Sequence, residues 1–71
     1  MDIRRRLGAN LKRLRVKHGW SQEKLAFEAS IHRTYISDLE RGARNPSIQL
    51  LEKLALSLGV PASDLIADRE V

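Results

Sequence analysis

Apolar residues recur at intervals of three and four along this chain, and no segment alternates with a period of two. Ile3, Leu7, Leu11 and Leu14 form one such stripe near the start. An α-helix has about 3.6 residues per turn, so this spacing places the four side chains on one helical face. β-branched residues are few. We therefore predict an all-α fold.

Turn-forming residues divide the chain into five segments with helical spacing. Gly19, Gly42 and Gly59 are placed to end helices, because glycine readily adopts the left-handed conformation. Ser21 and Ser47 are placed to begin helices, because a serine hydroxyl can accept a hydrogen bond from a free backbone N–H. The expected helices span about residues 3–18, 21–29, 33–41, 47–58 and 61–67.

The same spacing predicts which side chains form the core. Beyond the first stripe, the expected inner faces consist of Leu25, Ala26, Ala29, Ile36, Leu39, Ile48, Leu51, Leu54, Ala55 and Leu58. We expect Trp20 to tuck into this core and Phe27 to be half-buried.

The chain has 71 residues and no cysteine. A second core would not fit, so we expect a single domain over residues 1–71. The absence of cysteine excludes disulfides and Cys-ligated zinc or iron–sulfur sites, and suits a reducing cytoplasm. No apolar run approaches the roughly 20 residues that span a bilayer, and the basic start lacks the apolar stretch of a signal peptide. We expect a cytoplasmic protein without a membrane partner.

The net charge of +4 is concentrated at one end of the sequence. Residues 1–20 carry seven Lys or Arg and one Asp, a net +6. Residues 21–42 and residues 43–71 each carry three basic and four acidic side chains, a net −1. A basic opening segment is typical of nucleic-acid or membrane-surface binding, although a solvated helix face gives the same composition.

Two of the expected helices, residues 21–29 and 33–41, are joined by the three-residue break Ser30-Ile31-His32. This is the spacing of a helix-turn-helix, whose second helix enters the major groove of DNA. Its motifs are Ser21-Gln22-Glu23-Lys24-Leu25-Ala26, Ile36-Ser37-Asp38-Leu39-Glu40-Arg41-Gly42, and Asn45-Pro46-Ser47 followed by Leu51, Leu54 and Ala55. Over residues 6–66 the chain resembles the lambda-repressor-like (Xre/Cro/cI) helix-turn-helix family. The resemblance implies a five-helix DNA-binding domain.

Within that family, two segments look most like the controller proteins of restriction–modification systems. These segments are His32-Arg33-Thr34-Tyr35-Ile36-Ser37 and Glu40-Arg41-Gly42-Ala43-Arg44-Asn45. Such controllers are small dimeric regulators without a further domain. The resemblance implies a homodimer that binds a pseudo-palindromic operator and regulates its own promoter. Antitoxins and prophage or mobile-element regulators share this fold and have a protein as main partner, which leaves an alternative open.

The candidate base contacts lie on the exposed side of the third helix: Arg33, Thr34, Ser37 and Asp38. Arginine binds the O6 and N7 atoms of guanine, threonine contacts the thymine methyl group, and serine bonds to either base class. Asp38 would accept a hydrogen bond from cytosine N4 or repel a phosphate. Alternatively, it pairs with Arg41 at the i, i+3 spacing.

Phosphate contacts should surround these base contacts. Gln22 lies in the first turn of the second helix, where free backbone N–H groups attract anions, and the resemblance also implies a phosphate-binding Gln there. The expected phosphate contacts are Gln22, Tyr35, Arg41, Arg44, Asn45 and Ser47. The alternatives are that the Tyr35 ring only packs and that Asn45 only shapes the turn.

The resemblance further implies a partly buried ion pair between Arg15 and Glu40, which ties the first helix to the third without reading bases. Two positions depart from the family pattern. Ser30 stands where glycine is usual, and a non-glycine residue in the left-handed conformation costs about 1 kcal/mol. His32 stands where a Ser, Thr or Asp cap is expected, so its ring would have to cap the third helix or meet a phosphate.

Operator half-sites about 34 Å apart call for a symmetric dimer. The candidate dimer interface consists of Leu56, Val60, Leu65 and Ile66. An apolar patch of this kind on a small domain often marks an interface. Alternatively, Leu65 and Ile66 cover the core.

We predict a sequence-specific regulator of transcription that binds double-stranded DNA as a homodimer. RNA polymerase is a further partner if the regulator activates. An enzyme is not expected, because His18 and His32 are the only histidines and there is no cysteine nucleophile or Gly-rich phosphate loop. No cofactor and no metal are expected. Membrane-surface binding is disfavoured, because so small a protein needs the apolar stripe of its first helix for the core.

Overall fold

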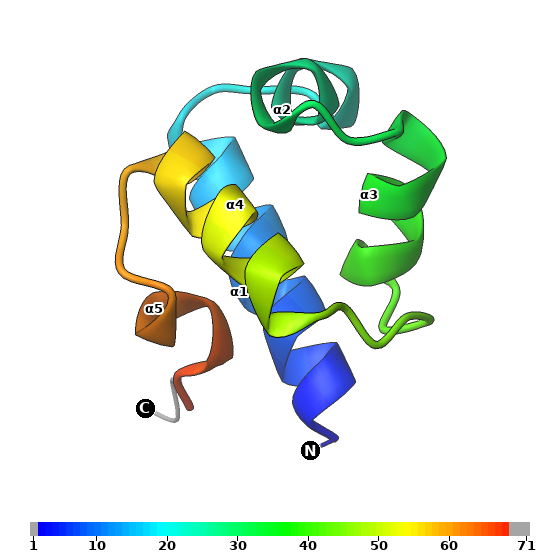
Figure 1. Cartoon of the computed structure of the whole chain (residues 1–71), viewed down its shortest axis with the longest axis vertical. Coiled ribbons are helices and arrows are strands. Elements are labelled where there is room, and N and C mark those ends of the chain that lie inside the picture. The colour runs from blue at the N-terminus through cyan, green and yellow to red at the C-terminus, as the bar shows by residue number, and fades with distance from the viewer. Residues whose placement is uncertain (1, 69–71) are drawn as a thin grey trace.

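The computed structural model describes residues 2–68, which form five α-helices and no strand. The helices are α1 (Ile3–Lys17), α2 (Gln22–Ala29), α3 (Arg33–Glu40), α4 (Ile48–Leu58) and α5 (Ser63–Ile66). α3 packs against one side of α1 and α5 against another, while α2 packs on α3 and α4 (Figure 1). The predicted all-α, five-helix fold is confirmed. None of the helices within residues 2–68 is long and apolar enough to cross a membrane.

The predicted helix boundaries correspond to observed caps. The hydroxyls of Ser21 and Ser47 accept hydrogen bonds from the backbone N–H groups of Lys24 and Leu50, at 3.0 and 3.1 Å. The glycines that follow α1, α3 and α4 have φ angles of 70–75°, as expected for residues that end a helix. The fifth helix is shorter than expected. It begins at Ser63 and not at Pro61, and it ends at Ile66 because Ala67 is already extended.

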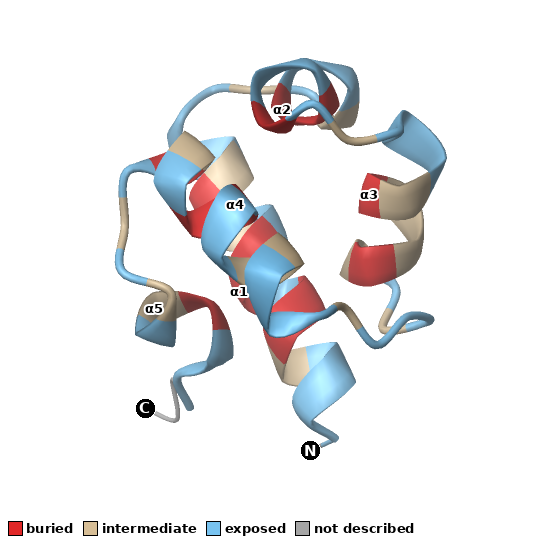
Figure 2. Ribbon diagram, viewed as in Figure 1, coloured by how far each residue is buried: buried red, intermediate tan, exposed pale blue. Residues whose placement is uncertain are grey.

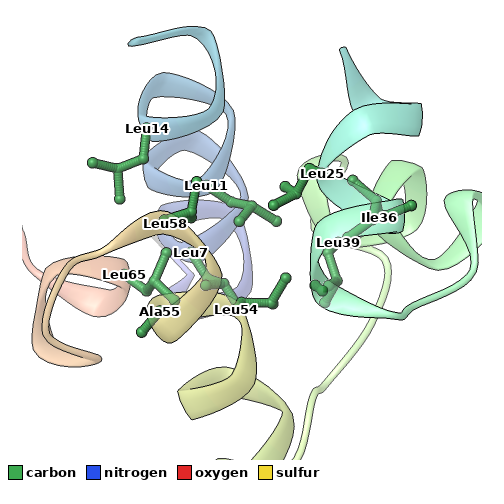
Figure 3. Close-up of a cluster of buried hydrophobic side chains, with 12 residues drawn as sticks. Leu7, Leu11, Leu14, Leu25, Ile36, Leu39, Leu54, Ala55, Leu58 and Leu65 are labelled. Atoms are coloured by element: carbon green, nitrogen blue, oxygen red, sulfur yellow. The ribbon is translucent and has the colours of Figure 1, made fainter. Parts of the chain in front are cut away.

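The core is built from leucines, isoleucine and alanines of all five helices (Figure 3). Three expectations were wrong. Ile3, the first residue of α1 and the first of the predicted stripe, is 52% exposed. Ile48 is 85% exposed, because it lies in the first turn of α4, at the end away from α2 (Figure 1). Phe27 is 77% exposed, because it follows Leu25 by two residues and Ala26 by one and therefore projects from the opposite side of α2. Trp20 is partly buried against the core, as expected.

Two residues of α1 fix its distances to the neighbouring helices. Gly8 is buried, and a methyl group on its Cα atom would lie 2.6 Å from the backbone carbonyl oxygens of both Leu39 and Glu40. α1 and α3 therefore approach each other backbone to backbone at this point. On the other side, the buried Asn10 amide donates to the carbonyls of Leu65 and Ala67 at 3.0 and 2.9 Å. These bonds hold the end of α5 against α1.

Candidate nucleic-acid interface

α2 and α3 are joined by a tight turn that depends on one unusual backbone conformation. Ser30 has φ 54° and ψ 45°, the left-handed conformation expected at this position. The turn lets the Ile31 backbone N–H donate to the Ala26 carbonyl at 2.9 Å, while the Ile31 side chain packs against the core. His32 precedes α3 but its ring makes no capping hydrogen bond. The conformation of the turn therefore depends on Ser30 and Ile31. His32 is exposed at the start of α3, and its imidazole does not cap this helix.

α3 is buried on one side and open at its start. Ile36 and Leu39 face the core, whereas Arg33 and Thr34 in the first turn are exposed (Figure 2). Ser37 is partly exposed on the following turn. Arg33 and Thr34 are therefore open to the outside, and Ser37 and Asp38 are partly so. Their contact with bases stays a prediction.

The start of α2 lies beside the start of α3. Gln22 and Arg33 line the same surface hollow, together with Arg15, Ser21 and Glu23. A phosphate contact and a base contact predicted from separate helices therefore converge on one place. This convergence is what a helix-turn-helix requires, because α2 must meet the backbone of the groove that α3 enters.

Glu40 accepts three hydrogen bonds from two residues, Arg15 on α1 and Gln22 on α2. Arg15 Nε lies 2.7 Å from Glu40 Oε2, and Arg15 Nη2 lies 3.0 Å from Oε1. Gln22 Nε2 also donates to Oε1, at 3.1 Å. The side chains of Arg15 and Glu40 are only 11% and 5% exposed, and the hydrogen bonds that Arg15 donates to Glu40 raise the pKa of Arg15. The ion pair implied by the resemblance is present, and it also orients Gln22.

Asp38 forms a second ionic group on the outer side of α3. Its Oδ1 atom contacts Arg41 Nη2, and its Oδ2 atom lies 3.1 Å from Arg44 Nε. The Arg44 guanidinium also lies 4.8 Å from the centre of the Tyr35 ring. The hydrogen bond from Arg44, followed by that from Arg41, lowers the pKa of Asp38. The alternative of an Asp38–Arg41 pair is therefore what the structure contains.

This arrangement bears on several predicted DNA contacts. Tyr35 is partly buried and its ring packs against the core, so the packing alternative applies in this structure. Asn45 and Ser47 are exposed in and after the loop between α3 and α4. The phosphate contacts assigned to Tyr35, Arg41, Arg44, Asn45 and Ser47 stay predictions.

The candidate dimer interface needs one correction. Leu65 is fully buried and belongs to the core, because the short α5 turns it toward α1. It has no surface to offer a partner. Leu56 is 75% exposed and Ile66 is 37% exposed, while Val60 is partly buried. An interface in this region would be formed by Leu56, Val60 and Ile66.

The model of the helix-turn-helix family matches residues 11–65, which include α2, the turn and α3. This chain belongs to the helix-turn-helix family. Control protein C.BamHI from Bacillus amyloliquefaciens is 50% identical over 66 residues, which make up 92% of this chain and 82% of that protein.

Solved structures agree with this helix-turn-helix assignment. The crystal structure of the hypothetical transcription factor NHTF from Neisseria matches with a TM-score of 0.93 and 41% identity, over 96% of this chain and 78% of that chain. The restriction–modification controller protein C.Esp1396I, solved as a tetramer in complex with its natural 35-base-pair operator, matches with a TM-score of 0.82 and 32% identity, over 92% and 86% of the two chains. The expected family, and the likeness to controller proteins within it, are confirmed.

The sequence interpretation missed three features of this helix-turn-helix protein. Gly8 interrupts the helical pattern of residues 3–18, and an isolated glycine inside a helix often has a packing reason, so this signal was available. Asn10 lies beside the apolar stripe with no sequence-level sign of its distant carbonyl partners. The hydrogen bond between Gln22 and Glu40 joins residues 18 positions apart and likewise leaves no local signal.

Proposed function

We propose that this protein is a sequence-specific regulator of transcription of the restriction–modification controller type, which binds double-stranded DNA as a homodimer. The observation that carries the proposal is that α3 is exposed at its start and fixed to α1 at its far end. Its first turn is exposed at Arg33 and Thr34, while its far end is fixed to α1 through Glu40 and the close approach at Gly8. A reading helix held in this way presents its base contacts without first having to order itself.

Two groups of residues divide the work at the DNA. Arg33, Thr34 and Ser37 contact base edges, and Gln22 contacts the phosphate backbone beside them. The net charge of +6 on residues 1–20 supplies a field that attracts the duplex without selecting a sequence. Within α3 and its cap, Arg33 and Arg41 offset Asp38 and Glu40, so selection rests on hydrogen bonds and shape.

The assembly follows from operator symmetry. C.Esp1396I was solved as a tetramer on its natural operator, and two copies of this chain would likewise place two α3 helices one turn of DNA apart. We assign the contact between the two copies to Leu56, Val60 and Ile66. The single domain over residues 1–71 then acts in the cytoplasm, either by occluding a promoter or by contacting RNA polymerase.

Selection from a random duplex library with the whole chain tests this function. We expect enrichment of an inverted repeat whose half-sites are about one helical turn apart. Failure to enrich any sequence would overturn the proposed function. Complexes that contain one copy of the chain would overturn the dimer.

The role of Arg33 is tested on the selected duplex. Arg33→Ala should weaken binding by about 1–3 kcal/mol and relax the preference at one base pair of each half-site. Lys12→Ala, at an exposed position of α1, is the matched control and should weaken binding equally on all sequences. An equally uniform loss in Arg33→Ala would make Arg33 a phosphate contact.

A further inference from the structure

The carboxylate of Asp38 is shared between two arginines that stand out from the same face. The Asp38 side chain is 16% exposed, whereas Arg41 and Arg44 are 65% and 49% exposed. Each carboxylate oxygen serves one arginine, Oδ1 for Arg41 and Oδ2 for Arg44. The acid is thus covered by the two bases, and the cluster carries one net positive charge in place of two.

Arg44 is held from both sides. Its Nε atom donates to Asp38, and its guanidinium lies over the ring of Tyr35. A cation stacked on an aromatic ring and bonded to a carboxylate has both its charge and its direction fixed. A DNA phosphate that approaches Arg44 must therefore displace the carboxylate or share the guanidinium with it.

Arg33 is in a different state. Among residues 2–68 it takes part in no ion pair, and it lies at the open first turn of α3. The arginine expected to read a base is available from the outset. The two arginines expected to bind phosphates, which any DNA sequence offers, already share one carboxylate of the protein itself.

We propose that Asp38 is an internal counter-anion that withholds Arg41 and Arg44 from DNA phosphates until base contacts seat α3 on its operator. Asp38 then lowers the affinity for random sequence more than the affinity for the operator, and so sets the ratio between them. This inference rests on the proposed function. It assigns Asp38 a task other than bonding to cytosine.

The test compares Asp38→Asn with Glu52→Gln, which removes the same charge from an exposed position of α4. Binding of a random-sequence duplex is measured against KCl concentration. Asp38→Asn raises the charge of the cluster from +1 to +2. Each phosphate that is newly neutralised steepens the log–log slope by about 0.9, so Asp38→Asn should steepen it by about 0.9. Glu52→Gln should leave the slope at its wild-type value. Equal changes in the two variants would reduce the effect to net charge and overturn the proposal.

Two additional comparisons test whether the released arginines cause the steeper salt dependence. Adding Arg44→Ala to Asp38→Asn should take back about 0.9 of the slope, because one of the released arginines is gone. On the selected operator, Asp38→Asn should keep the wild-type base preference. The ratio of its affinity for the operator to its affinity for a random duplex should be smaller than in the wild type. A lost preference at one base pair would make Asp38 a base contact and overturn the proposal.

A heparin column separates this proposal from the proposed function, because heparin is a polyanion without bases. Asp38→Asn should elute at a higher KCl concentration than Glu52→Gln, whether or not the protein has an operator. If the wild type selects no DNA sequence but this difference appears, the proposed function and the specificity role fail, and the withholding of the arginines stands. Elution of both variants together would overturn the withholding itself.

Discussion

α3 carries two ionic groups of similar chemistry on opposite sides. Glu40 faces α1 and is bonded to Arg15, with both side chains largely buried. Asp38, two residues earlier, faces outward and is bonded to Arg41 and Arg44, which are 65% and 49% exposed. Water and salt compete with exposed ion pairs, which contribute little to stability, whereas loss of one partner from a buried pair leaves an uncompensated charge. We call Arg15 and Glu40 the inner group, and Asp38, Arg41 and Arg44 the outer group. The inner group should therefore govern folding, and the outer group should govern DNA binding.

The inner group also reaches the interface. Glu40 Oε1 accepts from both Arg15 and Gln22, so the residue that ties α3 to α1 also orients the predicted phosphate contact on α2. The inner group should therefore affect DNA binding as well as folding. Substitutions with large and small expected effects on stability can distinguish the two roles.

The largest effect should come from breaking the inner group. Glu40→Gln removes the charge opposite Arg15, and we expect the free energy of unfolding to fall by about 3–5 kcal/mol in denaturant titrations. A domain of this size is typically stable by only about 4–11 kcal/mol. The exposed control Glu52→Gln should stay within about 0.5 kcal/mol of the wild type. A loss of that small size in Glu40→Gln would show that the inner group behaves like an exposed one.

A smaller loss should follow from separating the two helices that the inner group joins. Gly8→Ala places a methyl group against two backbone carbonyls of α3, and we expect a loss of about 1–3 kcal/mol, measured in the same titrations. At the neighbouring exposed position 9, alanine should be more stabilising than glycine, as is usual inside helices. There, Ala9→Gly should cost about 1 kcal/mol through helix propensity. Stabilisation by Gly8→Ala would contradict the close approach of α1 and α3.

These features show what the sequence could and could not predict. Helix extents, caps and most of the core follow from local rules, because spacing and capping act over a few residues. The exposure of Ile48 and Phe27 depends on how far neighbouring helices extend and at which angle they pack. Leu65 was assigned to the interface because a terminal apolar residue can either cover its own core or meet a partner. The bonds of Asn10 to the end of α5 decide in favour of the core.

The candidate site was predictable in its residue types and less so in its pairings. The helix-turn-helix spacing locates Arg33 and Gln22 at adjacent helix starts, as observed. That Asp38 holds Arg44 as well as Arg41 depends on the path of the loop between α3 and α4. This path brings residue 44 back toward α3, and it is not encoded in a local motif.

A gain of about 1 kcal/mol should result from relieving the strain at the turn. Ser30→Gly keeps the left-handed conformation without its steric cost, and should raise the free energy of unfolding by about that amount. In the Glu40→Gln background the same substitution should restore part of the stability but not the orientation of Gln22. If the double variant regains wild-type DNA affinity, the inner group serves folding alone.

The smallest effect on stability should come from the outer group, and it should depend on pH. The arginines hold the pKa of Asp38 below its ordinary value of 3.8, so the carboxylate favours the folded state above that value. The contribution is lost as the pH falls through the lowered pKa, where the acid becomes protonated in both states. Wild type and Asp38→Asn should therefore differ slightly in thermal midpoint at neutral pH and converge in acid. Asp2, whose pKa is lowered to about 2, also titrates in acid but is common to both proteins and cancels in the comparison. A difference that widens as the pH falls would show that Asp38 is not stabilised by its arginines in the folded protein.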